Sequence, residues 1–287
     1  MSHLSQKQHL ISQVYLRQFG YKRENQWYIS VWEKSKNSTD EFRIVDFNTE
    51  INIFDLPIGN LEERRHFESK SKFLEDNYSI IIKSLIHQKR LLPKHKDLLC
   101  HFLANMYCRP MPNRELIQSR LKNKNFKDAF LSEITMFNEN NLKEWKEFTE
   151  LTPLNIQLNF IIGQIMDYLI CVLRNFTFVI LKDYDNRGWF TSDNPVIIKI
   201  NENENHNEYP YLIPLDCELY FPLSSQFCLF GFHKSSTHIK NELKNLKENL
   251  IHNVTEQIHD MICKLSIQND SQYFIFNQEI PQTFLDS

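Results

Sequence analysis

Hydrophobic residues follow two different spacings along this chain. Near its beginning and in its last third, β-branched and aromatic residues form alternating or continuous runs, whereas the middle repeats apolar residues three and four positions apart. The first pattern is typical of strands and the second of helices. We therefore predict a single α+β domain over 1–287, with N-terminal strands at 1–60, a helical region at 61–174, and a mostly antiparallel sheet with a covering helix at 175–287.

Predicted strands come from aromatic and β-branched runs that are bounded by turn-forming residues. In the N-terminal region, 27–32 (WYISVW) and 42–45 predict two paired strands joined by a polar loop at 35–40. The last third predicts a sheet from six further runs, at 176–184, 189–191, 196–200, 217–221, 227–232 and 273–276. The polar segment 201–208 (NENENHNE) predicts a solvated loop or hairpin tip.

Predicted helices come from apolar positions that repeat at three and four residues. One helical pattern begins near Phe73, and Pro93 begins another that Pro110 ends. A further helical stretch continues to Phe137, and 154–173 is expected to be the most buried helix. Near the end, one long amphipathic helix is predicted from the spacing of Ile239, Leu243, Leu246, Leu250, Val254 and Ile258.

Composition and missing motifs exclude several function classes. The 287 residues include only 5 Gly, against about 20 at the usual frequency, and neither GxxxxGK[ST] nor GxGxxG occurs, so a phosphate-cradling loop is not expected. HExxH, GxSxG and CxxC are absent as well, which argues against common zinc-protease and serine-hydrolase chemistry. Lys and Arg total 33 against 36 Asp and Glu, a net charge of −3, so no bulk positive field attracts a polyanion.

The cysteines and the apolar segments predict a cytoplasmic protein. The six Cys lack the two-residue spacing of metal and redox pairs, and the opening MSHLSQKQHL lacks the basic-then-apolar pattern of a secretion signal. The most apolar stretch, 161–180, is interrupted by Gln164, Asp167, Arg174 and Asn175. We therefore predict no membrane span.

His9, Gln13 and Arg17 form a first candidate site. Because they are spaced four residues apart, they would share one polar stripe if this segment were helical. Arg17 offers a planar fork for a carboxylate or phosphate, and His9 can exchange a proton near neutral pH. In the structural alternative, which residue chemistry alone favours, Arg17 pairs with a carboxylate and His9 hydrogen-bonds a carbonyl.

The polar corner 191–196 (TSDNPV) forms a second candidate site. Pro195 favours an extended Asn194, so a sharp hydrogen-bonded turn between strands is expected. Asp193 would point out of this turn, where an aspartate can bind a metal or act as a general base. The structural alternative is an Asp193 that accepts hydrogen bonds from neighbouring backbone N–H groups.

These segments carry a family resemblance. The run from His9 to Phe19 resembles HxxPQxYLRxF, the opening of the bacterial family called domain of unknown function 4238, with Ser12 in place of its usual Pro. The segment around Met106 departs from the usual Gln of the family. Other matching positions follow in order over most of the chain: Trp27–Trp32, Leu74–Glu75, Phe102 through Arg109–Pro110, Thr191–Val196, Phe221–Ser224 and Asn253.

The resemblance implies one shared polar site built from His9, Gln13, Arg17, Glu75, Arg109, Asp193 and Asn194. From it we predict a nuclease-like phosphodiester hydrolase in a bacterial phage-defence or toxin setting, with nucleic acid as its partner. Asp193 and Glu75 would hold a divalent cation, Mg²⁺ or Mn²⁺, while His9 moves a proton. Arg17 and Arg109 would clamp the phosphate, with Gln13 and Asn194 as further substrate-binding groups.

The alternative prediction is a non-catalytic module that binds a protein partner or a second copy of the chain. In that case the same polar groups form a closed, satisfied network that fixes the fold, whereas an open cleft with converging carboxylates favours the hydrolase. His252, Glu256 and His259 would lie on one face of the predicted long helix and offer a transition-metal site. A solvated helix edge is the more common outcome for such side chains.

Overall fold

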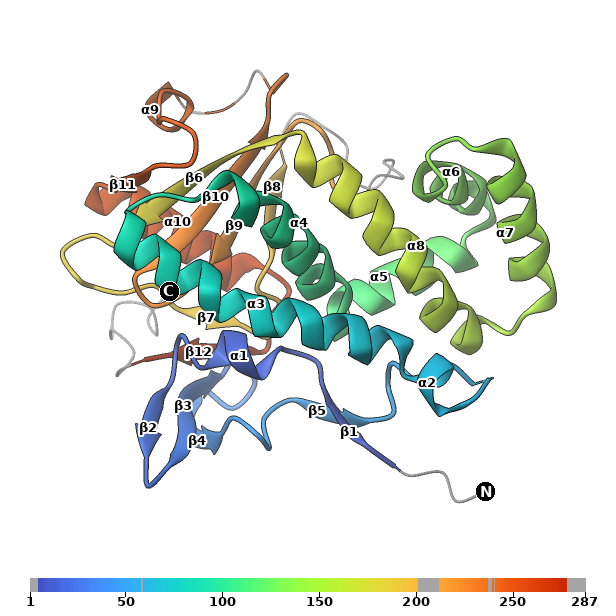
Figure 1. The fold of residues 1–287 in the computed structure, drawn as a ribbon, viewed down its shortest axis with the longest axis horizontal. Helices are drawn as coiled ribbons and strands as arrows, with labels where there is room; N and C mark the ends of the chain where they lie inside the picture. Colours follow the sequence, from blue (N-terminus) through green and yellow to red (C-terminus); the bar gives the residue numbers. More distant parts are fainter. Residues whose placement is uncertain (1–4, 58, 201–211, 237–238, 240, 278–287) are drawn as a thin grey trace.

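A computed structural model of the chain describes residues 5–57, 59–200, 212–236, 239 and 241–277. Strands come first, helices fill the middle, and strands return in the last third, as predicted for an α+β protein (Figure 1). The predicted loop at 201–208 lies outside the described residues.

The helical region has the bounds α2 (Leu61–Arg64), α3 (His66–Gln88), α4 (Pro93–Cys108), α5 (Met111–Lys122), α6 (Lys124–Ile134), α7 (Glu139–Leu151) and α8 (Leu154–Arg174). Its breaks follow local chemistry. Lys89 adopts a left-handed φ of 53° and ends α3, and Pro93 stands in the first turn of α4, where a missing N–H costs no hydrogen bond. α3 begins at His66 rather than near Phe73, because buried Phe67 adds one more apolar contact to its first turn.

α4, and not the segment at 154–173, is the most buried helix. Every residue from Phe102 to Cys108 is buried, so this half of α4 is covered on all sides. α4 packs against α3 on one side and α8 on the other, which explains the difference from the prediction (Figure 1). α8 lies between α4 and the pair α6 and α7, and one apolar side of it lines a pocket, so it is less completely buried than α4.

α8 contains the one candidate membrane span among the described residues. By length and composition its segment Ile156–Arg174 is apolar enough to cross a bilayer, with a mean hydropathy of 1.6. However, 56% of that segment is buried inside the protein, and α8 contacts α4, α5, α6 and α7. Such burial is typical of a core helix in a globular domain, which is the role of α8 in this fold.

A five-stranded sheet stands beside the helices, with the order β11-β6-β10-β9-β8. Its strands are β6 (Phe176–Lys182), β8 (Ile197–Ile200), β9 (Cys217–Pro222), β10 (Phe227–His233) and β11 (Ile251–Asn253). All neighbours are antiparallel except β11, which runs parallel to β6. The mostly antiparallel sheet predicted from the sequence is therefore confirmed.

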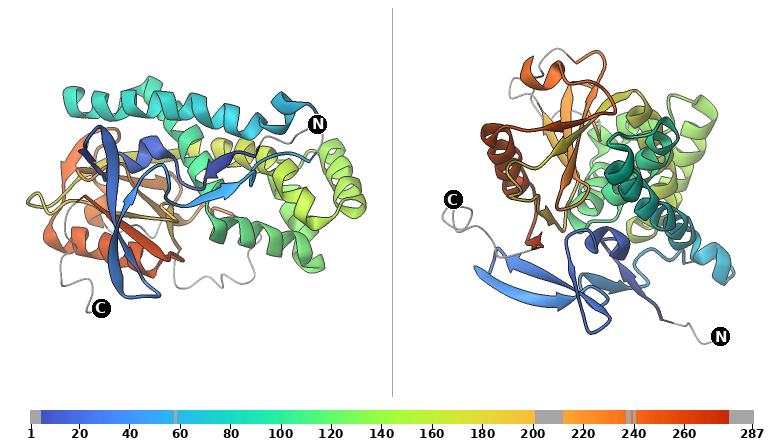
Figure 2. Two further views of the ribbon diagram at one scale, coloured as in Figure 1. Left: turned by 90° about the horizontal axis from the view of Figure 1, so that it is seen from below. Right: turned by 60° about the vertical axis from the view of Figure 1, so that its left-hand side comes forward.

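Both faces of this sheet are buried. Phe178, Ile180 and Phe221 belong to the core shared with the helices, whereas Val179 and Tyr220 face the opposite core. Figure 2 shows the sheet between the helices and α10 (Glu256–Gln268). A strand buried on both faces needs apolar residues at successive positions, which explains continuous runs such as FTFVIL.

A second sheet joins distant parts of the chain, with the order β2-β3-β12-β7 and β4 paired to β3. Its strands are β2 (Tyr21–Arg23), β3 (Gln26–Glu33), β4 (Ser38–Arg43), β7 (Thr191–Ser192) and β12 (Tyr273–Phe276). The predicted pairing of 27–32 with 42–45 is confirmed as β3 with β4, although β4 begins at Ser38, inside the predicted loop. A small additional ladder pairs β1 (Lys7–His9) with β5 (Thr49–Ile51).

The predicted long amphipathic helix over 239–258 is wrong. The chain forms the short α9 (Asn241–Lys244), then β11, then α10. Asn249 adopts a φ of 63° and donates its N–H to the Phe178 carbonyl, and the Ile180 N–H donates to the Leu250 carbonyl. The open edge of β6 therefore captures residues that carry helical spacing, because unpaired strand-edge groups gain hydrogen bonds from a new strand.

Candidate functional site

The opening segment of the chain forms only a short helix, so the predicted polar stripe does not exist. His9 ends β1, and α1 covers only Gln13–Leu16. The His9 ring still contacts Gln13, with Nδ1 at 3.4 Å from Nε2, while its other nitrogen lies 3.2 Å from the Val45 carbonyl. Burial lowers the pKa of His9, and the positive charge of Arg109 lowers it further. Arg17 follows α1 and is exposed.

Arg109 is a buried hub that binds backbone. Its Nε donates to the His9 carbonyl at 3.0 Å, and its Nη2 donates to the same oxygen. Two carboxylates of α3 flank the guanidinium, with Glu68 Oε1 at 3.3 Å from Nη2 and Glu75 Oε1 at 3.6 Å from Nη1. The predicted residues His9, Glu75 and Arg109 thus meet, but Arg109 is only 1% exposed and holds the chain rather than an open phosphate site.

Arg114, which the sequence did not single out, lies beside this hub. The guanidinium carbons of Arg109 and Arg114 are each 5.0 Å from the centre of the Phe54 ring, within cation–π range. Arg114 donates to Asn159 Oδ1 at 2.8 Å and to the Ile53 carbonyl at 3.2 Å. Burial lowers its pKa to about 10. These contacts join α5, α8 and the segment after β5 into one rigid wall.

The polar corner is a hydrogen-bonded turn, as its sequence predicts. Asp193 Oδ1 accepts from the backbone N–H groups of Gln272 at 3.0 Å and Tyr273 at 3.2 Å. Asn194 Oδ1 accepts from Asn113 Nδ2 at 3.0 Å, which ties the corner to α5. Asn194 therefore acts as a structural link between elements, and Asp193 holds the chain that leads into β12.

Asp193 also lines a pocket of about 600 Å³ beside this corner. Glu50, Glu115 and Asp270 are further acidic residues in its lining, together with Tyr273, and none of the described lining residues is Lys or Arg. Asp193 is 9% exposed, and burial raises its pKa to about 6 even though the two N–H groups oppose the shift. A carboxyl with this pKa can give and take a proton near neutral pH.

The predicted shared site is therefore divided between two places. Leu10, next to His9, lines the acidic pocket with Asp193, but Glu75 does not line it and instead contacts Arg109. Over the described residues, no group of three or more His, Cys, Asp or Glu side chains is placed to hold a metal ion. Because Glu75 contacts Arg109 and does not line the pocket of Asp193, the two carboxylates do not fit as a joint metal site.

The predicted metal face of His252, Glu256 and His259 is not formed. His252 lies on β11, whereas Glu256 and His259 lie on α10. Glu256 pairs with Arg187, and His259 is buried with Nε2 at 3.1 Å from the Gly188 carbonyl. The helix that would have aligned the three side chains is interrupted by β11, as described above.

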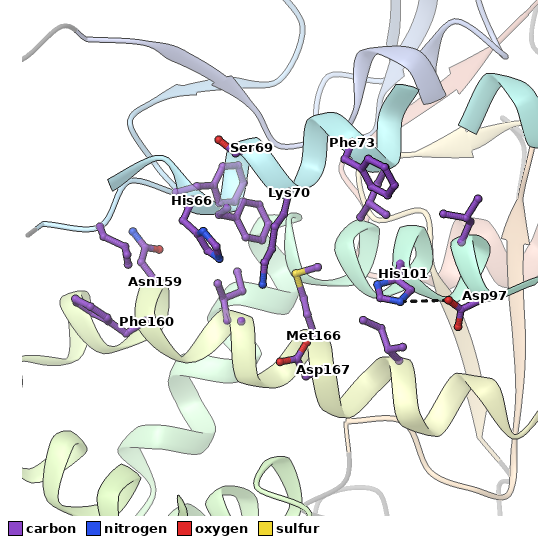
Figure 3. Close-up of a pocket in the computed structure, with 18 residues that line it drawn as sticks. His66, Ser69, Lys70, Phe73, Asp97, His101, Asn159, Phe160, Met166 and Asp167 are labelled. Carbon is purple, nitrogen blue, oxygen red and sulfur yellow. Dashed lines mark ion pairs between the residues drawn. The ribbon is translucent and has the colours of Figure 1, made fainter. Parts of the chain in front are cut away.

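A larger pocket lies elsewhere, between α3, α4 and α8 (Figure 3). Its volume is about 780 Å³. Its walls are aromatic and aliphatic: Phe54, Leu56, Phe67, Phe73, Leu74, Leu98, Phe160, Ile162, Met166 and Ile170. Gly163 lies among them on α8, and a Cβ at this position would meet no atom within 4 Å, so the pocket stays open against the helix backbone.

Polar groups gather around the mouth of this helical pocket (Figure 3). His66, Ser69 and Lys70 come from the first turns of α3 and are all exposed. On the far side Asp97 pairs with Arg174 at 2.7 Å and with His101 at 3.6 Å. The sequence carried one signal of this pocket, the large apolar Phe73 directly after Ser71 and Lys72, which the structure leaves 61% exposed at the rim.

Comparison with known proteins gives one match. A family model described as "Protein of unknown function (DUF4238)" matches residues 7–278, nearly the whole chain. No curated protein and no solved structure matches this chain. The match spans the Arg109 hub, the acidic pocket and the helical pocket alike.

Proposed function

This chain belongs to the DUF4238 family, and from the pocket between α3, α4 and α8 we propose that it is a ligand-binding protein that encloses an apolar small molecule. The pocket volume of about 780 Å³ carries the proposal. Ligand pockets generally measure about 300–1,000 Å³ and combine apolar walls with a few polar groups. The helical pocket has this composition.

The rigidity of the walls supports this proposal. Phe54 and Phe67 stack on each other, with ring centres 4.6 Å apart, and Arg109 lies against both rings. Asn159 donates to the carbonyls of Ile53 and Asp55 at 3.0 Å each. A pocket whose walls are fixed before binding loses little entropy when a ligand enters. In this proposal the buried polar network positions the pocket, as expected for a non-catalytic module.

Fluorescence titration with Nile red, an uncharged apolar dye, tests the proposal. The Gly163→Phe variant places an aromatic ring in open space beside the walls, whereas the matched Gly163→Ala variant leaves most of the volume free. We expect saturable binding by the wild-type protein and by Gly163→Ala, and binding weakened by about tenfold or more in Gly163→Phe, because the ring displaces the dye. Equal binding by all three proteins, or no binding by the wild type, would overturn the proposal.

A second proposed function is the nuclease-like hydrolase, now centred on Asp193 alone. It is favoured by one observation: a carboxyl with a raised pKa faces a pocket of about 600 Å³. Asp193 would serve as general acid or base, and His9 would act from the adjoining segment. The exposed Arg17 and the enclosed Arg109 do not line this pocket, so neither clamps a phosphate there. The defence or toxin setting stays a prediction.

Cleavage of labelled RNA and DNA tests this second function, with Mg²⁺, with Mn²⁺ and without metal. The variants are His9→Ala and Asp193→Asn, with Asp183→Asn as the matched control because Asp183 is equally buried and lies outside the acidic pocket. We expect the first two to lose activity by about 100-fold, the usual contribution of an acid or base, and the control to keep it. Absence of wild-type cleavage, or cleavage that survives Asp193→Asn, rules this site out.

A further inference from the structure

Donor groups at the mouth of the helical pocket indicate the chemistry of its ligand. His66, Ser69 and Lys70 occupy positions i, i+3 and i+4 of α3, so the three side chains share one face of the helix. All three line the pocket (Figure 3). In Figure 3 the side chains of Lys70 and His66 extend toward the pocket, whereas the Ser69 hydroxyl points away from it. The ammonium and the imidazole are suited to hold a carboxylate or a similar anion.

Lys70 is the available cation of this group. In the described part of the chain, no Asp or Glu oxygen lies within ion-pair distance of its ammonium, whereas the neighbouring Glu68 and Glu75 contact Arg109. Asp97, on the opposite rim, already has Arg174 and His101 as partners. A negatively charged ligand would therefore meet an unpaired ammonium on α3, while a cationic ligand would find Asp97 occupied.

Asp167 is the opposing charge at the mouth. It projects from α8 on the wall facing Lys70 (Figure 3), is exposed, and forms no ion pair with a described residue. Its carboxylate weakens the attraction of a ligand anion to Lys70, but solvent screens a charge in this position. The imidazole of His66 lies on the same wall as Lys70 (Figure 3), so the balance of donors still favours an anion.

The interior of the pocket indicates the chemistry of the rest of the ligand, beyond its anionic group. Phe67, Leu74 and Met166 are buried side chains of its wall and offer no charged or strongly polar group. An anion alone would leave this apolar volume filled with water, which is unfavourable. An unbranched alkyl chain of moderate length can fill it and bring its head to the mouth.

We infer that the ligand of the helical pocket is a carboxylate-bearing amphiphile, with its alkyl chain among the walls and its carboxylate at Lys70 and His66. This inference rests on the proposed ligand-binding function and adds the identity of the head group. Lys70 is a binding residue in this arrangement, and Asp167 reduces the affinity. Because the head group is exposed at the mouth, the chain supplies most of the affinity and the head group supplies selectivity.

Displacement of Nile red by three dodecyl compounds tests the inference: dodecanoate, dodecanol and dodecylammonium, each kept below the concentration at which it forms micelles. For the wild type we expect dodecanoate to bind most tightly, with an affinity about fivefold or more above that of dodecanol. Dodecylammonium should bind most weakly. Lys70→Met should remove the advantage of dodecanoate and leave dodecanol unchanged. Asp167→Asn should strengthen the binding of dodecanoate and weaken the binding of dodecylammonium.

The outcomes separate the two proposals. If dodecanoate and dodecanol bind equally well, or Lys70→Met leaves their ratio unchanged, the inference about the head group is overturned while the ligand-binding function stands. If Nile red itself fails to bind, the ligand-binding function falls, and the inference falls with it. Both variants alter exposed side chains and should therefore fold, which thermal unfolding of each protein verifies.

Discussion

The hydroxyl of Tyr15 lies 2.6 Å from Oγ1 of Thr191, although 176 positions separate the two residues in the chain. Tyr15 also donates to the Pro222 carbonyl at 2.8 Å, so Thr191 is its hydrogen-bond donor. The opening segment therefore meets the polar corner before Val196 through the buried Tyr15, whereas His9 and Asp193 contact other residues. The two hydrogen bonds of the Tyr15 hydroxyl link α1 with β7 and with β9.

Tyr15→Phe should reduce the free energy of unfolding by about 1–3 kcal/mol, because it leaves a buried hydroxyl and a buried carbonyl without their partner. Urea denaturation measures the change. Tyr28→Phe is the matched control, since the Tyr28 hydroxyl makes exposed contacts with Gln26, at 3.4 Å, and with Arg23, and their loss should cost less than about 0.5 kcal/mol. Equal effects of the two variants would contradict a structural role for the Tyr15 hydroxyl.

Arg109→Met and Arg17→Met separate a buried arginine from an exposed one of the same predicted site. Removal of the Arg109 guanidinium leaves the His9 carbonyl unpaired and Glu68 and Glu75 without their cation, so we expect a loss of about 2–4 kcal/mol. Arg17 is exposed, so its replacement should change stability by less than about 0.5 kcal/mol. Chemical denaturation of both variants measures the two changes in the free energy of unfolding. Similar losses in the two variants would refute the distinction.

Glu133 should make stability depend on pH. Burial raises its pKa to about 7, although hydrogen bonds from the Tyr168 side chain and the Leu212 N–H oppose the shift. Because the folded state binds this proton more tightly than the unfolded chain, the contribution of Glu133 is present at low pH and is lost as pH rises from about 4.5 to about 7. Glu133→Gln does not show this loss. Between those two pH values the free energy of unfolding of the variant should therefore rise by about 3 kcal/mol relative to that of the wild type. Parallel stability curves against pH would contradict this assignment.

Two glycines should respond in opposite directions to alanine. A Cβ at Gly231 on β10 would lie 3.0 Å from the Phe178 ring, so Gly231→Ala should cost about 1–3 kcal/mol through overpacking. Gly163 has no neighbour within 4 Å of that position and stands inside α8, where alanine is the better helix former. Gly163→Ala should therefore stabilise the protein by about 0.5–1 kcal/mol. Thermal unfolding measures both shifts, and shifts of the same sign would refute the packing argument.

Much of the fold could be predicted from the sequence because local patterns and final packing agree. Apolar spacing located the helices that carry Tyr78 and Leu99, and both residues are buried as that spacing requires. The error over 239–258 has a clear origin. Leu250 and Val254 have helical spacing, but their structure is determined by the edge of β6, which is far away in the sequence. A local sequence pattern contains no information about such an edge.

The candidate site could be predicted less well. Arg109 and Glu75 do meet, yet the sequence did not reveal that the Arg109 guanidinium is engaged by a backbone carbonyl. Arg114 looks like any helix arginine in the sequence, and only the fold gives it Asn159 and Phe54 as partners. The helical pocket depends on a space between three helices, which no spacing along a single helix describes.

The pairing of β12 with β3 has a consequence for synthesis on the ribosome. β3 emerges early, but its neighbour β12 follows roughly 240 residues later, which corresponds to about 12–50 s at ordinary rates of translation. During that interval one side of β3 lacks its final partner. Nascent chains of this protein should therefore remain dependent on chaperones until release, and a stop codon before Tyr273 should give a product that is degraded rather than partly active.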